Sequence, residues 1–139
     1  MKSILFVVLL VSSLMASCQT HWDKASAWTL YSYQGRRIFR LPIDSLERYD
    51  NLYLNQDTMA SLIKSSKIAD TQAAHIWMGG YAATCKIDGT IRKVDISNYG
   101  GYFFDERTGV YYQLPPEKIE AWQTFLKDSY RTLVTKNRN

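Results

Sequence analysis

The sequence predicts an α+β fold in which an antiparallel meander sheet is packed by a C-terminal amphipathic helix. Near the C-terminus, apolar residues recur at three- and four-residue spacing, which is typical of a helix with one buried face. Ahead of that stretch, short runs of strand-forming residues alternate with glycine-containing turns. One or two short helices are expected in the N-terminal half.

The first expected element is a hairpin. Residues 28–33 and 37–41 are rich in β-branched, aromatic and other apolar residues, and they flank Gly35. Pro42 cannot donate to a strand ladder, so it should end the second strand. We therefore expect the two stretches to pair with each other.

Two short helices are expected after the hairpin. Asp44 is a favoured capping residue and should start a helix that reaches Tyr49. Asp57 should start another helix. The apolar residues of that second helix share one face and are expected to be buried: Met59, Leu62 and Ile63.

The second half of the chain predicts a meander of neighbouring strands. Asp88 and Gly89 favour a tight hairpin turn because both accept positive φ angles. Gly109 can take the left-handed position of a bulged turn between the last two strands. The strands are expected at residues 76–86, 91–97, 102–105 and 110–114.

A C-terminal helix is expected to start near Pro116 and Glu117, since proline suits the first turn and glutamate complements the helix dipole. Its apolar stripe should cover the inner face of the sheet. The stripe consists of Ile119, Trp122, Phe125, Leu126, Tyr130 and Leu133.

Residues 41–49 and 114–122 resemble each other. Both start with Leu-Pro, followed by an acid, an aliphatic and an aromatic residue. Two copies of such strand-ending and helix-starting chemistry are weak evidence for a repeat.

The N-terminus has the three parts of an export signal. Lys2 precedes an apolar run over residues 4–11, and the run ends in small residues before Cys18. This run is too short for a membrane-spanning helix, which needs about 20 apolar residues. We expect residues 1–17 to be removed as a signal peptide and residues 18–26 to form a tether. Residues 27–139 should then form a single α+β domain.

Residues 14–18, Leu-Met-Ala-Ser-Cys, resemble the lipobox of bacterial lipoproteins, in which the cysteine receives diacylglycerol before cleavage. The departure is Met15, where that family more often carries leucine. The resemblance covers 18 of 139 residues and implies a lipid on Cys18 that holds the protein to the bilayer. Gln19 after the cysteine favours the outer membrane over the inner one, by resemblance to sorting in enteric bacteria. Ordinary cleavage near Ser17, which would release a soluble protein, is the alternative.

The chain has two cysteines, and their states are linked. If Cys18 carries a lipid, Cys85 is a lone thiol of the kind that is more often buried than reactive. If cleavage leaves Cys18 unmodified, a disulfide between Cys18 and Cys85 becomes possible in an oxidising compartment.

Several activities can be argued down from the sequence. The only histidines are His21, in the expected tether, and His75, which would lie about 33 Å from Cys85 along a continuous strand. Nucleophilic catalysis and zinc binding both need such groups close together. Asp88 lacks the ladder of acids found in calcium loops. We therefore expect a non-catalytic domain without metal or cofactor. Nucleic-acid binding is not expected either, because the net charge of +4 includes no dense basic patch.

High aromatic content is the remaining functional signal, with ten tyrosines and four tryptophans. Such side chains are enriched at recognition surfaces. We expect a membrane-anchored protein of the cell envelope that binds a protein partner, with an inhibitor or immunity protein as one subclass. The alternative is a small-ligand or glycan-binding module of the periplasm or cell surface. The candidate binding surface consists of Trp77, Tyr81, Tyr99, Tyr102 and Tyr111.

Overall fold

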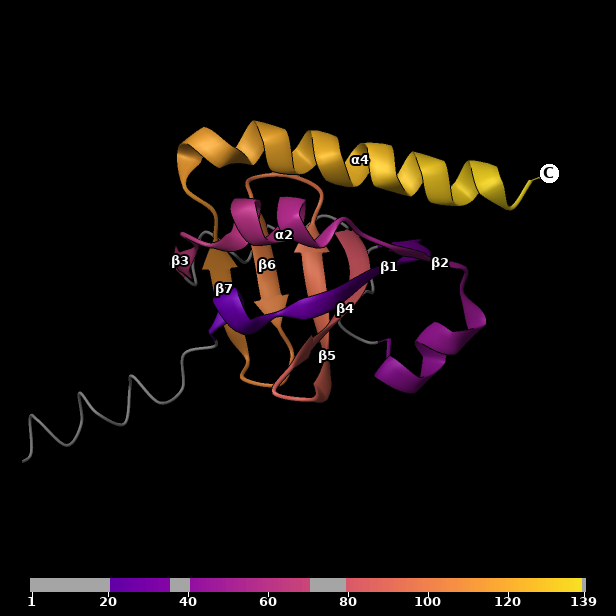
Figure 1. Cartoon of the computed structure of the whole chain (residues 1–139), viewed down its shortest axis with the longest axis horizontal. Coiled ribbons are helices and arrows are strands. Elements are labelled where there is room, and N and C mark those ends of the chain that lie inside the picture. The colour runs from indigo at the N-terminus through magenta and orange to yellow at the C-terminus, as the bar shows by residue number, and fades with distance from the viewer. Residues whose placement is uncertain (1–20, 36–40, 71–79, 139) are drawn as a thin grey trace, which may run out of the picture.

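The protein folds around one seven-stranded sheet whose described pairings are all antiparallel. The structure is a computed structural model that describes residues 21–35, 41–70 and 80–138 of the chain. The strand order is β2-β1-β4-β5-β6-β7-β3, with one long helix lying across a face of the sheet (Figure 1). The predicted α+β class is confirmed.

The meander occupies the middle of the sheet as expected. It consists of β4 (Gly80–Ile87), β5 (Thr90–Ser97), β6 (Tyr102–Asp105) and β7 (Val110–Gln113), each paired with the next. Asp88 and Gly89 turn between β4 and β5 with φ angles of 50° and 76°. Gly109 has a φ of 69° in the turn before β7, as the sequence predicted. Residues 76–79 of the first expected strand lie outside the described residues.

The N-terminal strand has two described partners that the sequence did not predict. The strand β1 (Ser26–Gly35) lies between β4 and a short strand, β2 (Asn51–Tyr53). Its expected partner, residues 37–41, falls almost entirely outside the described residues. At the other end of the sheet, β3 (Lys67–Ile68) pairs with β7. Neither edge strand could be predicted from the sequence, because two or three residues are too few to show an alternating pattern.

The short helices are present, but their caps differ from the prediction. The helix α2 (Gln56–Ile63) is capped by Asn55, whose side chain accepts a hydrogen bond from the backbone N–H of Thr58. Asp57 lies in its first turn rather than at its start. Residues 43–48 form a 3-10 helix, η3 (Ile43–Arg48), which has no side-chain cap, so the capping role expected for Asp44 is wrong. The predicted buried face of α2 is confirmed: Met59, Leu62 and Ile63.

The C-terminal helix covers the sheet as predicted. A 3-10 turn, η4 (Pro116–Lys118), leads into α4 (Ile119–Lys136). The interior positions of its apolar stripe are buried, and the outer positions pack against the same core. The fully buried side chains are Trp122, Leu126 and Leu133.

The packed domain begins earlier than the expected boundary at residue 27. A 3-10 turn, η1 (Trp22–Lys24), places the indole of Trp22 in the core with 6% of its surface exposed. Its ring centroid lies 5.1 Å from that of Phe103 and 5.3 Å from that of Tyr112. The tether assignment for residues 18–26 is therefore wrong for Trp22, because burial of a large indole outweighs the polarity of its neighbours.

Two glycines shape the turn between β5 and β6. Gly100 and Gly101 have φ angles of 74° and 67°. A Cβ on Gly100 would lie 2.6 Å from Cε2 of Tyr102, so the tyrosine ring rests directly over this glycine. A Cβ on Gly101 would lie 2.8 Å from Cγ1 of Ile119. Glycine at both positions lets the turn hold Tyr102 in place and lets the start of α4 approach the sheet closely.

Candidate functional site

The sheet face opposite α4 presents polar and aromatic side chains in ordered rows. Phe103 and Tyr112 point into the core beneath α4, so their neighbours along β6 and β7 point to the other face. One row runs from Lys67 through Gln113 to Tyr102 across β3, β7 and β6. The next row includes Tyr111 and Phe104, whose ring centroids are 4.5 Å apart.

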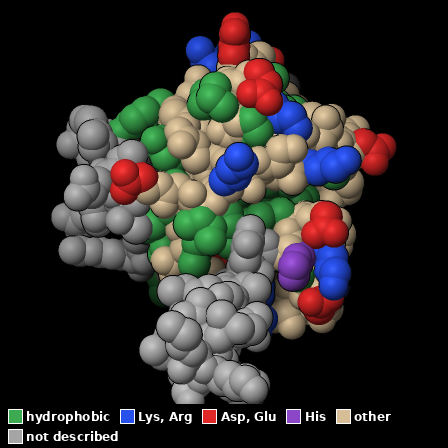
Figure 2. Space-filling view, turned by 90° about the vertical axis from the view of Figure 1, so that its left-hand side faces the viewer, with side chains coloured by type: hydrophobic (Ala, Val, Ile, Leu, Met, Phe, Trp, Pro, Cys, Tyr) green, Lys and Arg blue, Asp and Glu red, His purple; other side chains and the backbone are tan. Residues whose placement is uncertain are grey.

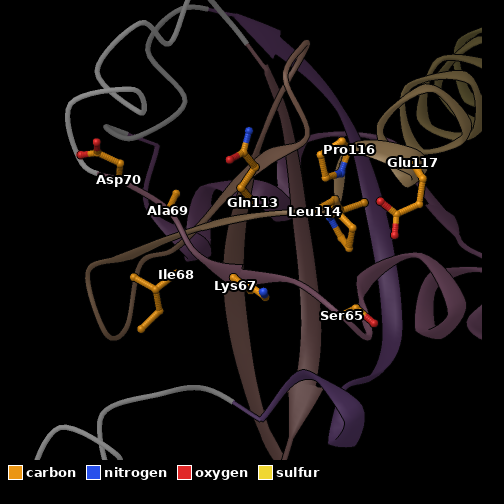
Figure 3. Close-up of a pocket in the computed structure, with 10 residues that line it drawn as sticks. Ser65, Lys67, Ile68, Ala69, Asp70, Gln113, Leu114, Pro116 and Glu117 are labelled. Atoms are coloured by element: carbon orange, nitrogen blue, oxygen red, sulfur yellow. The ribbon is translucent and has the colours of Figure 1, made fainter.

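A groove of about 560 Å³ borders these rows at the β3 edge. Residues 65 and 67–70 line one side, and residues 113–117 line the other. Figure 3 shows the two segments that line the groove, one carrying Ser65, Lys67, Ile68, Ala69 and Asp70 and the other carrying Gln113, Leu114, Pro116 and Glu117. The volume is within the range of small-molecule and peptide pockets.

The sequence explains why a groove opens at this point. Pro115 and Pro116 have no backbone N–H, so they cannot continue the ladder of β7 with β3 beyond Gln113. The two chains diverge there, as β7 leads into α4. Lys118 Nζ donates to the carbonyl oxygen of Ser61 at 2.6 Å, which ties η4 to α2. This bond and the pairing of β3 with β7 hold the two walls of the groove in place.

Among the described residues, β3 is an edge strand with backbone groups that point away from its partner. The N–H of Ala69 donates to the carbonyl oxygen of Tyr111 at 2.8 Å. In an antiparallel ladder the N–H and C=O of the preceding residue, Ile68, then point away from β7. The Ile68 side chain is 56% exposed. An edge of this kind is a template for one more strand.

Charges of both signs surround this edge. Lys67, Asp70 and Glu117 line the groove, which gives it one basic and two acidic side chains. Figure 2 views the molecule from this side and shows hydrophobic side chains interspersed with charged ones. A partner segment that combines an apolar and a basic side chain would complement the groove.

The structure splits the predicted aromatic surface. Tyr81 is only 8% exposed and packs against Tyr130 with ring centroids 5.4 Å apart, so its assignment to a surface is wrong. It lies on the helix-facing side of β4 together with Ala83 and Cys85. Trp77 lies outside the described residues.

The other three predicted tyrosines lie toward the groove end of the sheet. Tyr102 and Tyr111 are half-buried in the rows that lead to β3, and Tyr99 is 38% exposed in the turn after β5. Gln113 Nε2 donates to the carbonyl oxygen of Gly100 at 3.2 Å, which joins that turn to a groove residue. Sequence reasoning missed the groove itself because residues 65–70 and 113–117 are far apart along the chain.

A buried charge cluster lies on the same face of the sheet. Lys93 Nζ is 2.6 Å from Asp95 Oδ1 and 2.9 Å from Glu106 Oε2. The Asp95 side chain is fully buried, and its Oδ2 atom has no hydrogen-bond partner among the described residues. One ammonium group thus faces two carboxyl groups, of which Glu106 is closer to solvent.

The surroundings of Asp95 raise its pKa from 3.8 to about 7. Burial is the largest cause, Lys93 opposes it, and Glu106 adds to the rise because two adjacent carboxylates repel each other. A protonated Asp95 leaves Lys93 and Glu106 as a charge-balanced pair.

The raised pKa of Asp95 predicts a pH-dependent stability. The folded carboxyl binds its proton more tightly than the unfolded one, so its contribution is present at low pH and is lost as the pH rises through about 7. Each pKa unit between the two states corresponds to about 1.4 kcal/mol. Urea unfolding should show wild-type protein gaining more stability than Asp95→Asn between about pH 8 and about pH 5. Equal gains in both proteins would contradict the assignment.

Cys85 is not suited to a reactive role. The thiol is 1% exposed and is a free cysteine. Burial, followed by the charge of Asp105, raises the pKa of Cys85 to about 12. Since the thiolate is the nucleophile, such a group is almost entirely protonated and unreactive at neutral pH.

No protein-family model matches the chain, and neither curated proteins nor solved structures give a significant match. Among the described residues, no three His, Cys, Asp or Glu side chains are grouped so that they could hold a metal ion. The helices in this described part are also too short or too polar to cross a membrane.

Proposed function

We propose that this protein is exported, is anchored to a bacterial membrane through a lipid on Cys18, and binds a protein partner without catalysing a reaction. The outer membrane is the favoured location. The binding site is the groove at the β3 edge, and its occupant is an extended segment of the partner. An inhibitor or immunity protein of the envelope is the subclass that best suits a small domain of this kind.

The export part of the proposal rests on the N-terminal sequence. The apolar run and the Leu-Met-Ala-Ser-Cys segment that follows it resemble a lipoprotein signal. Diacylglycerol and an N-terminal acyl chain together give a stable anchor, because each buried methylene contributes about 0.8 kcal/mol. Such an anchor would keep the folded domain close to the membrane.

The proposal that the protein binds a partner rests on one observation. The outer edge of β3, which ends the described sheet, lies beside a groove. A partner strand that pairs with Ile68 through its backbone would lie on the side of β3 away from β7, and a side chain of that strand would reach across β3 into the groove lined by residues 113–117. In this mode the backbone hydrogen bonds supply affinity, and pockets for alternate side chains supply specificity. The groove would accept one side chain of the partner, with Glu117 favouring a basic neighbour.

Strand addition at Ile68 predicts a specific effect of proline. The Ile68→Pro protein should lose the partner, because proline removes the outward N–H that the added strand would bind. The fold should persist, since this N–H makes no bond to β7. Ile68→Val keeps both the N–H and an apolar side chain, and it should retain binding. Thermal unfolding would verify that both variants are folded.

A photo-crosslinking residue placed at Glu117, in the groove, provides the measurement in intact cells. The same residue at Glu120, exposed on α4, is the matched control. We expect a defined adduct from position 117 alone, and we expect Ile68→Pro to abolish it. Equal labelling from both positions, or an adduct unaffected by Ile68→Pro, would refute binding at this edge.

A further inference from the structure

A second hollow lies at the opposite edge of the sheet, beside β2. It has a volume of about 250 Å³ and lies on the face opposite α4, between β2, β1 and β4. Cross-strand pairing of Tyr53 with Thr29 and of Asn51 with Tyr31 places these four side chains on that face. The position is distant from the β3 groove, since β2 and β3 end the sheet on opposite sides (Figure 1).

The most exposed part of this hollow is an aromatic ring. Tyr53 is 77% exposed, the largest value among the large hydrophobic side chains of the described residues. Ile91, also lining the hollow, is 58% exposed. Neither side chain is part of the core, so the exposed surfaces of both can contact a ligand.

The floor of the hollow is built from hydroxyl groups. Tyr31 Oη and Thr84 Oγ1 share a hydrogen bond of 3.3 Å, and Thr29 Oγ1 donates to the carbonyl oxygen of Ala27 at 3.2 Å. The amide of Asn51 lies at the edge strand. Hydroxyl and amide groups both donate and accept hydrogen bonds. Among the described lining residues Lys86 is the one charged side chain, so the hollow is suited to a neutral ligand.

The backbone at this place is also irregular. Ala27 has a φ of 52°, which is strained for a residue with a Cβ, and the register of β1 with β4 shifts between Ser26 and Thr29. Such bulges and strained residues occur preferentially next to functional sites. Here the bulge lies at the wall of the hollow.

We infer that this hollow binds a neutral sugar unit of a glycan, with the ring stacked on Tyr53 and its hydroxyls bonded to Asn51, Thr29 and Thr84. A sugar has an apolar ring face and a rim of groups that both donate and accept. The exposed ring of Tyr53 suits the apolar ring face, and the hydroxyl and amide side chains suit the polar rim. The inference is independent of the partner site at β3.

Calorimetric titration of the purified protein with cellotetraose, maltotetraose and chitotetraose tests this inference. We expect at least one of these neutral tetrasaccharides to bind. Tyr53→Ala should weaken that binding by about tenfold or more through loss of the stacked ring. Asn51→Ala should weaken it as well. Tyr99→Ala removes an exposed tyrosine elsewhere and should leave the affinity unchanged.

Absence of binding by all three sugars would overturn the inference. Binding with equal affinity to wild type and to Tyr53→Ala would also overturn it, because the sugar would then lie elsewhere. Ile68→Pro should bind sugar normally, so failure of the partner proposal and failure of this one give different results. Since Tyr53 is exposed, its replacement is not expected to unfold the protein.

Discussion

Trp22→Ala is expected to lower the free energy of unfolding by about 3–5 kcal/mol, the usual cost of removing a large buried aromatic side chain. The residue lies in a segment that composition alone marks as a tether, yet its indole is buried. It stacks at 6.0 Å from Trp28 and meets Phe103 and Tyr112 edge to face. Its loss would open a cavity where η1 closes over the sheet.

Urea unfolding followed by circular dichroism measures this effect, with two matched variants. His21→Ala changes the exposed neighbour and should alter stability by less than about 0.5 kcal/mol. Trp22→Phe keeps an aromatic ring in the core and removes an indole N–H that has no hydrogen-bond partner in the described part of the chain, so it should cost less than the alanine. Trp22→Ala and His21→Ala proteins of equal stability would contradict the packing of this segment.

The elements that the sequence predicted well are those with a long or strict pattern. The stripe of α4 repeats over several turns, so its buried face around Trp122 and Leu126 could be identified directly. The turns at Gly89 and Gly109 depend on positive φ, which few residue types adopt easily. These local requirements predict the meander without any knowledge of distant contacts.

The features that could not be predicted depend on contacts between distant segments. The strands β2 and β3 are edge strands of two or three residues, and pairing with β1 and β7 defines them. Trp22 looks solvent-exposed beside His21 and Asp23 until β6 and β7 are placed beneath it. Tyr81 looked like a surface residue because aromatic content does not reveal which face of a strand is covered.

The two candidate binding sites also depend on contacts between segments that are distant along the chain. The β3 groove exists because prolines end the ladder at Gln113, and only the register of β3 with β7 locates it. The hollow at Tyr53 depends on β2, whose pairing the sequence did not reveal. Of the predicted surface, Tyr102 and Tyr111 do lie in the rows that lead to the groove.

Cys18→Ser is expected to have the largest effect on location. If the lipid is attached to this residue, serine cannot form the thioether, and the protein should appear in the soluble fraction or accumulate with its signal uncleaved. Two or three acyl chains would hold the wild type far more firmly than any exposed side chain could. Fractionation of cells into membrane and soluble parts, followed by immunoblotting, measures the change.

Cys85→Ser provides the matched control, since it changes the other cysteine of the chain. The Cys85 thiol is buried in the core, so its replacement should leave membrane association as it is in the wild type. If both serine variants remained in the membrane fraction, the protein would be held there by something other than a lipid on Cys18.

Mass spectrometry of the N-terminus of the mature protein tests the lipid anchor most directly. We expect the chain to begin at Cys18 and this residue to carry the mass of a diacylglycerol thioether. Loss of that mass after Cys18→Ser, with no change after Cys85→Ser, would complete the result. An unmodified Cys18, or a peptide in which Cys18 is bridged to Cys85, would contradict the lipid anchor.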